Sequence, residues 1–577
     1  MRYLALCCDY DGTIAHHGTV DAATVAALER FRAAGRRLVL VTGRELEDLQ
    51  AVCPHLHLFE RVVAENGALL YRPDTGEERR LGEPPPVEFV TALRSRGIER
   101  VSVGRVIVAT WEPHQHQVLE AIRELGLELQ VIFNKGAVMV LPAGVNKASG
   151  LKCALAEMGL SPHNAVGIGD AENDHAFLSI CECAVAVANA LPALKERADI
   201  VTTAAHGDGV IELIDELLEH ELASHEAQLT RHHITLGHDS QGAPVRLSPY
   251  GINALVVGTS GGGKSTVAVG LVERLRASDY SFCIIDPEGD YDNVESAVVA
   301  GSPDHVPTLD ECVQLICKPA TNAVINLLGL KLEDRPGFFL SLFARVTEIR
   351  GRTGRPHLLI VDEAHHVLPA NWQPAEAHMP EHLDGVLLVS VTPNLVAQSI
   401  LEAIDTVIVL GEKPQDMLQE FAVANQLLTQ VDPRPLEPGT ALIWNKTLQL
   451  PPLLVHLEPS RTERRRHLRK YAEGELPPDR SFYFRGPEGK LKLRAHNLIL
   501  FMDMADGVDD DTWRYHLERG EISTWIGEHI KDQGLAHQIA VVERDHHLDP
   551  NTSRQQVRNL IEAQYTLPAT ARAASST

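Results

Sequence analysis

The chain has 577 residues, which is too many for a single hydrophobic core and predicts two to four domains. Its hydrophobic fraction of 44% is ordinary for a soluble globular protein, and no apolar run approaches the roughly 20 residues that span a bilayer. The net charge of −25 disfavours a broadly basic surface for nucleic acid, although a local basic pore is compatible with it. Nine cysteines without a CxxC pair favour a reduced, cytoplasmic protein without a disulfide framework or zinc site.

Apolar runs alternate with amphipathic stretches along most of the chain, which predicts βαβ units, parallel sheets and an α/β fold. Glycine- and proline-rich segments bracket a smaller α/β insertion in the first domain. The C-terminal part instead shows helical periodicity. The predicted order is a first α/β domain at 1–220 with an insertion at about 84–143, a second at 230–456, a charged linker at 461–480, a mostly helical module at 481–565 and a disordered tail at 566–577.

Two carboxylates follow the first apolar strand at Asp9 and Asp11. Alternation along a strand lets both address one phosphate, so one can attack phosphorus while the other protonates the leaving oxygen and later activates water. Thr42 ends the second strand and can donate to a phosphoryl oxygen, and Lys147 can neutralise phosphoryl charge. Asp170, with Asp174 beyond it, ends a later strand and offers the oxygen ligands that Mg²⁺ requires.

This order of motifs resembles the haloacid dehalogenase (HAD) superfamily over roughly the first 215 residues, and its details resemble the class IIB, or Cof-type, phosphatases. The resemblance implies a Rossmann-like domain with a small α/β cap, Asp9 as the nucleophile and Asp11 as the general acid/base. The implied phosphate-binding residues are Thr42, Gly43, Lys147 and Asn173. The implied Mg²⁺ ligands are Asp9, Asp11 (including its backbone carbonyl), Asp170 and Asp174.

A glycine-rich phosphate loop between Gly258 and Thr266 follows an apolar strand of the second domain and precedes a helix. Glycine-permitted curvature and the helix N-terminus direct N–H groups and positive potential at phosphate. Downstream, a buried strand ends in Asp362, expected to support Mg²⁺, and Glu363, expected to polarise the attacking water. The predicted nucleotide-binding residues are Gly258, Ser260, Gly261, Gly262, Gly263, Lys264, Ser265 (also a Mg²⁺ ligand), Thr266, Asp362 and Asn394.

Together with Asp286 and Thr392 at the ends of two further strands, these motifs resemble the HerA/FtsK division of P-loop ATPases, and HerA-like and VirB4-like proteins in particular. The resemblance implies a RecA-like domain, a hexameric ring that translocates DNA or polypeptide, and an arginine finger from a neighbouring subunit. The β-barrel that usually precedes this ATPase core is absent here. The candidate fingers are Arg345, Arg350, Arg352 and Arg355.

Several other polar residues are interpreted as structural. His365 and His366 extend the DE motif, but further helicase motifs are missing. In the C-terminal module, Trp513, His516 and their neighbours fit an apolar helix face better than a metal site.

Three functional hypotheses follow, all requiring Mg²⁺ and ATP. In the first, an ATPase ring scaffolds or regulates a phosphatase that acts on a small phosphorylated substrate, and no membrane is a partner. In the second, the ring is a nucleic-acid motor, of which an antiphage motor is one form, and the phosphatase acts on nucleotides or DNA ends. In the third, the ATPase remodels a protein partner. The acidic charge favours the first and third, whereas the ATPase resemblance favours the second.

Overall fold

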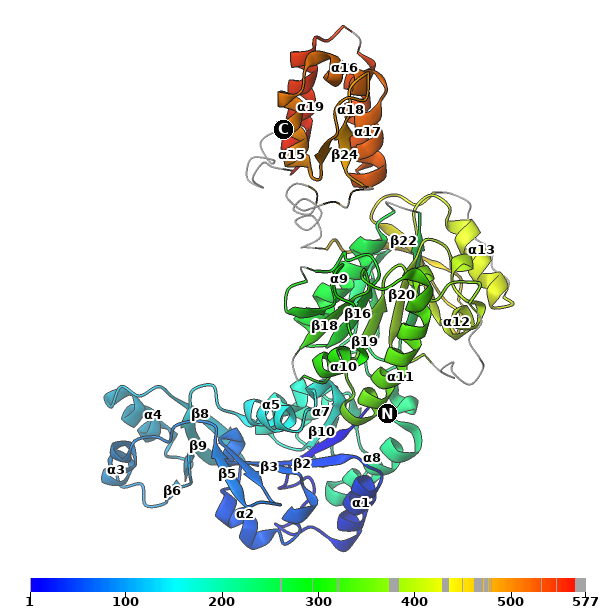
Figure 1. The fold of residues 1–577 in the computed structure, drawn as a ribbon. Helices are drawn as coiled ribbons and strands as arrows, with labels where there is room; N and C mark the ends of the chain where they lie inside the picture. The colour runs from blue at the N-terminus through cyan, green and yellow to red at the C-terminus, as the bar shows by residue number, and fades with distance from the viewer. Residues whose placement is uncertain are drawn as a thin grey trace.

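The computed structural model describes residues 2–259, 262–292, 294–318, 321–372, 383–427, 435–448, 450–460, 471, 476, 478, 480–530, 532–545 and 547–565. An N-terminal, a central and a C-terminal part follow one another along the molecule (Figure 1). None of the described helices combines the length and the apolar character needed to cross a membrane. Ser260 and Gly261 of the predicted phosphate loop, most of the predicted linker and the predicted tail fall outside the described residues.

The N-terminal part is built on an eight-stranded sheet in the order β12-β11-β10-β1-β2-β3-β4-β5, with β12 to β3 parallel. Its central strands are almost wholly buried, as expected for a parallel sheet covered on both faces. The strands are β1 (Ala5–Cys8), β2 (Arg37–Val41), β3 (Arg61–Ala64), β4 (Leu69–Arg72), β5 (Glu77–Arg80), β10 (Ala165–Gly169), β11 (Cys183–Ala186) and β12 (Ile200–Val201). The helices are α1 (Ala22–Ala33), α2 (Leu46–Val52), α5 (Lys147–Glu157), α6 (His175–Ile180), α7 (Pro192–Lys195) and α8 (His206–His220).

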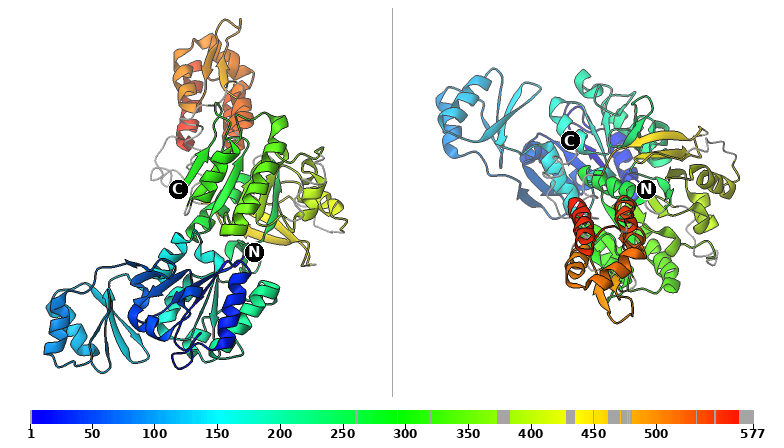
Figure 2. Two further views of the ribbon diagram at one scale, coloured as in Figure 1. Left: turned by 60° about the horizontal axis from the view of Figure 1, so that its bottom comes forward. Right: turned by 90° about the horizontal axis from the view of Figure 1, so that it is seen from above.

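A small α/β cap projects from this sheet, away from the central part (Figure 2). Its antiparallel strands run in the order β6-β7-β9-β8, and two helices cover one face. The opposite face packs toward the N-terminal sheet through residues such as Met139 and Leu141. The elements are β6 (Ser102–Val103), β7 (Val108–Trp111), β8 (Leu129–Asn134), β9 (Ala137–Pro142), α3 (Val87–Ser95) and α4 (Gln115–Glu124).

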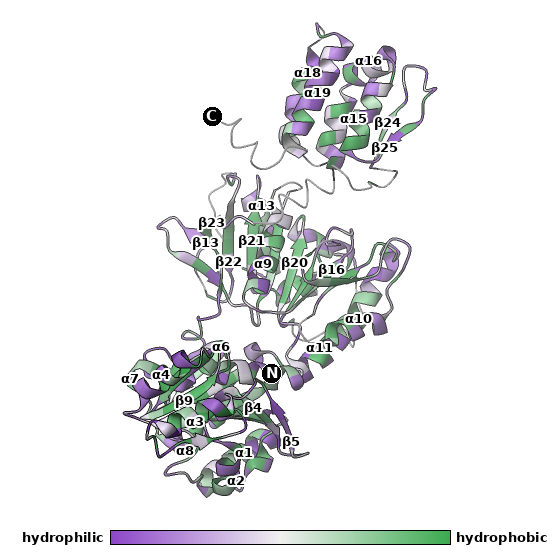
Figure 3. Ribbon diagram, turned by 90° about the vertical axis from the view of Figure 1, so that its left-hand side faces the viewer, coloured by the Kyte–Doolittle hydropathy of each residue, from purple (hydrophilic) through white to green (hydrophobic). Residues whose placement is uncertain are grey.

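The central part is an eleven-stranded sheet in the order β14-β13-β23-β22-β21-β15-β20-β19-β16-β18-β17. Strands β21 to β17 are parallel, and the predicted hairpin β13–β14 lies at one edge. These strands are largely apolar (Figure 3). They are β13 (Ile234–Asp239), β14 (Pro244–Leu247), β15 (Asn253–Gly258), β16 (Phe282–Asp286), β17 (Ala297–Ala300), β18 (Asn322–Asn326), β19 (Leu358–Val361), β20 (Val386–Ser390), β21 (Thr406–Leu410), β22 (Thr440–Asn445) and β23 (Leu453–Leu457). The helices are α9 (Lys264–Ala277), α10 (Leu309–Cys317), α11 (Arg335–Thr353), α12 (Gln398–Ala403) and α13 (Pro414–Ala424).

The C-terminal part is mostly helical, as predicted, and packs around Trp513, which is fully buried. His516 is equally buried: its Nε2 accepts from the Arg485 N–H at 2.9 Å, and its Nδ1 lies 2.6 Å from Glu521. The histidine therefore belongs to the core, as the apolar-face interpretation expected. The elements are β24 (Phe482–Phe484), β25 (Leu493–Ala495), α15 (Leu498–Gly507), α16 (Asp510–Glu518), α17 (Glu521–Trp525), α18 (Gln533–Arg544) and α19 (Pro550–Tyr565).

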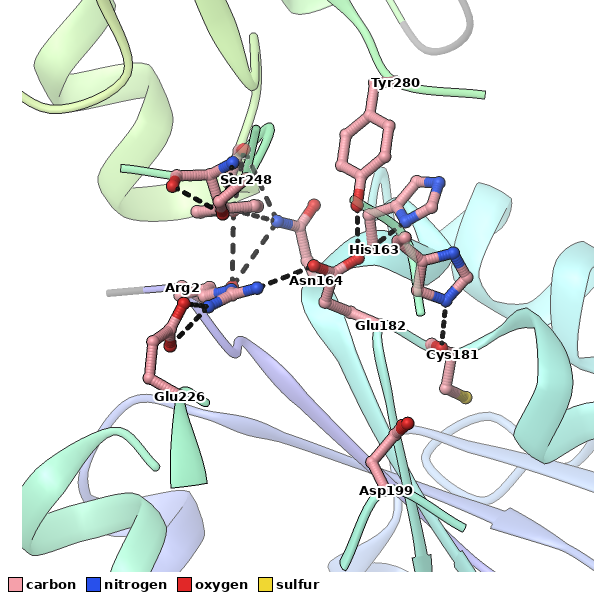
Figure 4. Close-up of polar contacts among 12 residues, drawn as sticks. Arg2, His163, Asn164, Cys181, Glu182, Asp199, Glu226, Ser248 and Tyr280 are labelled. Carbon is pink, nitrogen blue, oxygen red and sulfur yellow. Dashed lines mark hydrogen bonds and ion pairs between the residues drawn. The ribbon is translucent and has the colours of Figure 1, made fainter. Parts of the chain in front are cut away.

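The N-terminal and central sheets meet through the segments that precede their strands. Glu182, just before β11, accepts hydrogen bonds from Tyr280, just before β16, and from Arg2, just before β1, at 2.6 and 2.7 Å (Figure 4). His163 stacks on the Tyr280 ring at 3.7 Å and reaches the Ser278 carbonyl at 2.7 Å. The amino-terminal edges of the two sheets therefore face each other.

A second group of contacts extends this junction. Asn164, just before β10, donates to the Tyr250 hydroxyl at 2.5 Å, and the Arg355 guanidinium donates to the Gly159 carbonyl at 2.6 Å. Arg2 lies over the Tyr250 ring, 5.0 Å from its centre. Buried polar groups that are paired across a boundary resist separation, because parting them would leave unsatisfied donors and acceptors.

Candidate active sites

The first site lies at the carboxyl ends of β1 and β10. Asp9 is buried directly after β1, and the Lys147 ammonium bridges it to Asp174, with Nζ–Oδ1 distances of 2.5 and 2.6 Å. Burial raises the pKa of Asp9, and the neighbouring Asp174 carboxylate adds to this, while Lys147 opposes it. Burial also works against the charged form of Lys147, but Asp174 and Asp9 outweigh it and raise the pKa of the lysine. Lys147 is therefore a fixed cation beside the candidate nucleophile.

Lys147 owes its position to the turn after β3. A side chain at Gly67 would lie 1.9 Å from the Asn146 carbonyl, and φ there is +104°, so only glycine fits. Asn146 in turn caps α5 by accepting from the Ser149 N–H at 3.0 Å. This close approach fixes the first residue of α5, which is Lys147.

Asp11 is oriented by Arg44, whose Nε and Nη2 donate to its carboxylate at 2.6 and 2.7 Å. A bidentate pair of this kind fixes both the position and the plane of the carboxylate. The Arg44 guanidinium is engaged by both Asp11 and Asp48.

The predicted phosphate-binding residues surround the same point. Thr42 is buried after β2, and its hydroxyl accepts from the Arg44 N–H at 3.2 Å. Asn173 donates to Asn66 at 3.0 Å, and a side chain at Gly43 would lie 3.5 Å from the Asn173 amide nitrogen. The structure thus brings Thr42, Gly43, Asn173 and Lys147 together with Asp9.

The carboxylates of Asp9, Asp170 and Asp174 offer oxygens within 4.8 Å of one another, close enough to share a metal ion. Asp174 accepts from the N–H groups of Asp170 and Ala171 through one oxygen and from Lys147 through the other. Within the described residues, Asp170 Oδ1 is buried without a hydrogen-bond partner. The Asp170 Oδ2 and Asp11 carbonyl oxygens both face a cation, the Lys135 ammonium, at 2.8 and 3.0 Å. These oxygens therefore fit Mg²⁺, and Asp170 is the carboxylate that keeps one oxygen without a hydrogen-bond partner among the described residues.

Two functional residues escaped the sequence analysis. Lys135 comes from the cap, and only the NKG turn between two strands hinted at an exposed side chain there. Glu65 is buried after β3 and accepts from the N–H groups of Arg105, Val106 and Ile107 in the cap at 2.7–2.9 Å. Glu65 thereby fastens the cap over the site, a role that no local pattern signals.

The second site lies at the carboxyl ends of β15 and β19. Gly263 (φ +93°) leads into α9, Ser265 and Thr266 occupy its first turn, and the buried Lys264 ammonium lies 3.0 Å from the Gly258 carbonyl. Asp362 is buried directly after β19, and burial, followed by the charge of Glu363, raises its pKa to about 7.

Glu363 has φ +40°, a left-handed conformation that is unfavourable outside glycine and is often found at functional positions. His365 lies 3.3 Å from the Ser390 hydroxyl and 3.5 Å from Glu363. Burial and the charge of His366 lower the pKa of His365 to about 4. This agrees with the interpretation of His365 as a structural residue.

The remaining candidates divide clearly. Asp286, the last residue of β16, accepts from three backbone N–H groups of the loop that follows, and Asn394, after β20, is exposed. Arg350 donates to the carbonyls of Pro356, Asp384 and Gly385, and Arg355 is committed to the junction. Arg345 and Arg352 are exposed beside Glu348. Two of the four candidate fingers are therefore used within the chain.

Comparison with known proteins identifies relatives of two of the domains. A family model for haloacid dehalogenase-like hydrolases matches residues 6–81 and 95–214, and a model for the central domain of the helicase HerA matches 239–339. A phosphoglycolate phosphatase of Methanothermobacter thermautotrophicus is 36% identical over 223 residues, which is 37% of this chain and 97% of that protein. The chain belongs to the haloacid dehalogenase-like hydrolase family. It joins a phosphatase domain of that family to a HerA-like ATPase domain, and it is a hydrolase.

Other relatives cover a similar share of this chain. A phosphoglycolate phosphatase of Haloarcula marismortui is 32% identical over 36% of this chain and 93% of its own length. A haloacid dehalogenase-like hydrolase from Bacteroides thetaiotaomicron with a solved structure is 18% identical over 37% of this chain and 99% of its own, with a TM-score of 0.34. The HerA match ends before Asp362 and Glu363.

Proposed function

We propose that the protein is a bifunctional enzyme that hydrolyses a small phosphorylated acid at the first site and ATP at the second, both with Mg²⁺. The observation that carries the first activity is the bridge from Lys147 to Asp9 and Asp174, beside an Asp11 clamped by Arg44. The names of the relatives, phosphoglycolate phosphatases, motivate the choice of a carboxylate-bearing substrate.

In the proposed reaction, an Asp9 carboxylate oxygen attacks phosphorus while Asp11 protonates the departing alkoxide oxygen. The product alcohol leaves, and an aspartyl-phosphate remains on Asp9. Asp11, now ionised, takes a proton from water as that water attacks phosphorus, which releases inorganic phosphate and restores Asp9. Mg²⁺ on Asp170 and the Asp11 carbonyl would neutralise phosphoryl charge. Arg44 sets the direction of the Asp11 carboxylate, and Lys147 balances the charge that develops beside Asp9.

In the ATPase domain, we propose that Lys264 and the first turn of α9 bind the phosphates, and that Ser265 and Asp362 support Mg²⁺. Glu363 is proposed to polarise the attacking water. We also propose that six copies form a ring and that this ring scaffolds or regulates the phosphatase. A neighbouring subunit would supply an arginine to each ATP site, and Arg345 and Arg352 are the exposed candidates for that arginine.

The test is Asp9→Asn, which preserves shape but removes the nucleophile. Hydrolysis of 2-phosphoglycolate is expected to fall by about 10³-fold or more, with ATP turnover within about twofold of the wild type. Phosphate release from each substrate, measured separately, checks this. Retained phosphatase activity would remove Asp9 from the nucleophile's role.

A nucleic-acid motor is the alternative that a specific observation favours, because the central match is to a helicase domain. The Asp9→Asn protein allows a clean measurement, since its phosphatase contributes no phosphate. ATP turnover that rises several-fold with double-stranded DNA at low salt, and falls as salt is added, would favour the motor. Unchanged turnover would favour the scaffolding ring, or a ring that remodels a protein partner.

A further inference from the structure

Lys135 is placed in the first active site by the geometry of the cap. It forms the turn between β8 and β9 together with Gly136, and both residues have positive φ, +47° and +87°. Asn134 and Ala137 pair across the base of this turn. Positive φ at both central residues is the pattern of a tight type I′ hairpin, which sets the direction of the side chain at its tip.

The Lys135 ammonium faces the two oxygens that fit the metal. Its Nζ lies 2.8 Å from Asp170 Oδ2 and 3.0 Å from the Asp11 carbonyl oxygen. A Mg²⁺ ion takes its oxygen ligands at about 2.0–2.1 Å, so an ammonium cannot remain at hydrogen-bond distance from both oxygens beside it. Binding of the ion therefore releases Lys135 from Asp170, and the lysine needs another anion.

The two lysines of the site differ in their freedom to move. Lys147 has a side-chain exposure of 1% and is fixed by two carboxylates. Lys135 is 47% exposed, on a flexible stem, and lies at the mouth rather than the base of the site. Lys135 can therefore follow a ligand, whereas Lys147 cannot.

The surroundings of Lys135 are acidic, so an anionic leaving group needs a cation at this point. Strand β8 lies against the Glu172–Asp174 turn, so the cap covers the site at this point. Asp9, Asp11, Asp170 and Asp174 concentrate negative charge below it. A substrate carboxylate entering this chamber would be repelled unless a cation met it, and interactions of this kind are strong where water is partly excluded. Among the described polar atoms, Asn134 Oδ1 is buried next to Lys135 without a partner.

We propose that Lys135 is the specificity-determining residue for the leaving group, and that its ammonium binds the carboxylate of a phosphorylated hydroxy acid once the metal occupies Asp170 and the Asp11 carbonyl. This inference rests on the proposed phosphatase function. Lys135 thereby selects substrates by a charge pair located on the cap, while the phosphoryl group is recognised by the domain below.

The first experiment compares 2-phosphoglycolate with ethyl phosphate, which has the same two-carbon leaving group without the carboxylate. For Lys135→Met, kcat/KM for 2-phosphoglycolate is expected to fall about 10- to 100-fold, mainly through KM, because the charge pair with the substrate carboxylate is lost. Ethyl phosphate should change by less than about threefold. Lys135→Arg should retain part of the preference, and Lys152→Met, at an exposed position of α5, is the matched control.

The second experiment measures binding without turnover. Calorimetry of Mg²⁺ with the metal-free protein should show tighter binding to Lys135→Met than to the wild type, by about threefold or more, because the ion no longer displaces an internal cation. In the Asp9→Asn background with Mg²⁺, Lys135→Met should weaken 2-phosphoglycolate binding and leave ethyl phosphate binding unchanged.

The outcomes separate the inference from the function on which it rests. A wild-type enzyme that shows no preference for 2-phosphoglycolate over ethyl phosphate overturns the proposed substrate class and the role of Lys135 together. A wild-type preference that survives in Lys135→Met overturns the role of Lys135 alone. An equal loss on both substrates also overturns it, because it indicates general damage to the site.

Discussion

The two candidate active sites each hold a buried lysine, but they orient it by different means. Lys147 is fixed by the carboxylates of Asp9 and Asp174, whereas the Lys264 ammonium lies against the main-chain carbonyls of Gly258 and Thr259. Lys147 is thus positioned by side chains, among them the proposed nucleophile. Lys264 is positioned by backbone curvature. The comparison teaches that the site for which a covalent intermediate is proposed carries its own charge balance, while the phosphate loop relies on its backbone.

After the loss expected for Asp9→Asn, the largest expected effect on turnover comes from removing the loop lysine. Lys264→Ala should lower ATP turnover by about 100-fold or more, because the β- and γ-phosphates lose their cation. If the two sites are independent, hydrolysis of 2-phosphoglycolate should stay within about twofold. A phosphatase rate that falls more than about tenfold would instead reveal coupling of at least ~1.4 kcal/mol between them.

An intermediate effect is expected at the junction that joins the two domains. Hydrogen bonds and ion pairs from His163, Arg2 and Tyr280 outweigh burial and lower the pKa of Glu182 to about 2. The folded pKa lies below the ordinary value near 4.5, so the carboxylate stabilises the fold above about pH 4.5. This stabilisation, on the order of 3 kcal/mol, should be lost as the pH falls toward about 2.

Glu182→Gln tests this directly. The difference in unfolding free energy between the wild type and the variant should be largest near neutral pH and shrink as the solution is acidified through that window. Glu219→Gln, at an exposed glutamate on α8, serves as the control. A difference that does not depend on pH would assign the stabilisation to shape rather than charge.

The smallest effect is steric. Gly354 has φ +65°, and a methyl group there would lie 2.1 Å from the Asn164 amide across the junction. Gly439 has φ +83° with nothing within 4 Å of such a group, so Gly439→Ala carries the backbone cost alone. Gly354→Ala should therefore destabilise the protein by about 1–2 kcal/mol more than Gly439→Ala, as measured by denaturant unfolding. Equal losses would mean that Asn164 moves aside freely.

The sequence predicted the α/β fold and the sets of residues that the structure brings together, because strand-end carboxylates and glycine loops are local patterns tied to known geometry. It missed Lys135 and Glu65, since both act across the boundary between cap and domain. It also could not separate the four arginines. Arg350 and Arg355 differ from Arg345 and Arg352 partly through the carbonyl groups of Gly385 and Gly159, which distant segments bring to them.

Because the two sheets meet at their amino-terminal edges, the two catalytic centres lie at opposite ends of the joined sheets. Asp9 and Asp170 lie at the far ends of β1 and β10, and Lys264 and Asp362 lie beyond the far ends of β15 and β19, so the two centres point in opposite directions. Two strand lengths, about 30 Å at ~3.3 Å per residue, separate them. Within one chain, a product of one centre is therefore not handed directly to the other, and we expect a scavenging enzyme added to the solution to intercept it. Coupling between the two reactions of one chain would have to cross the junction between the two sheets.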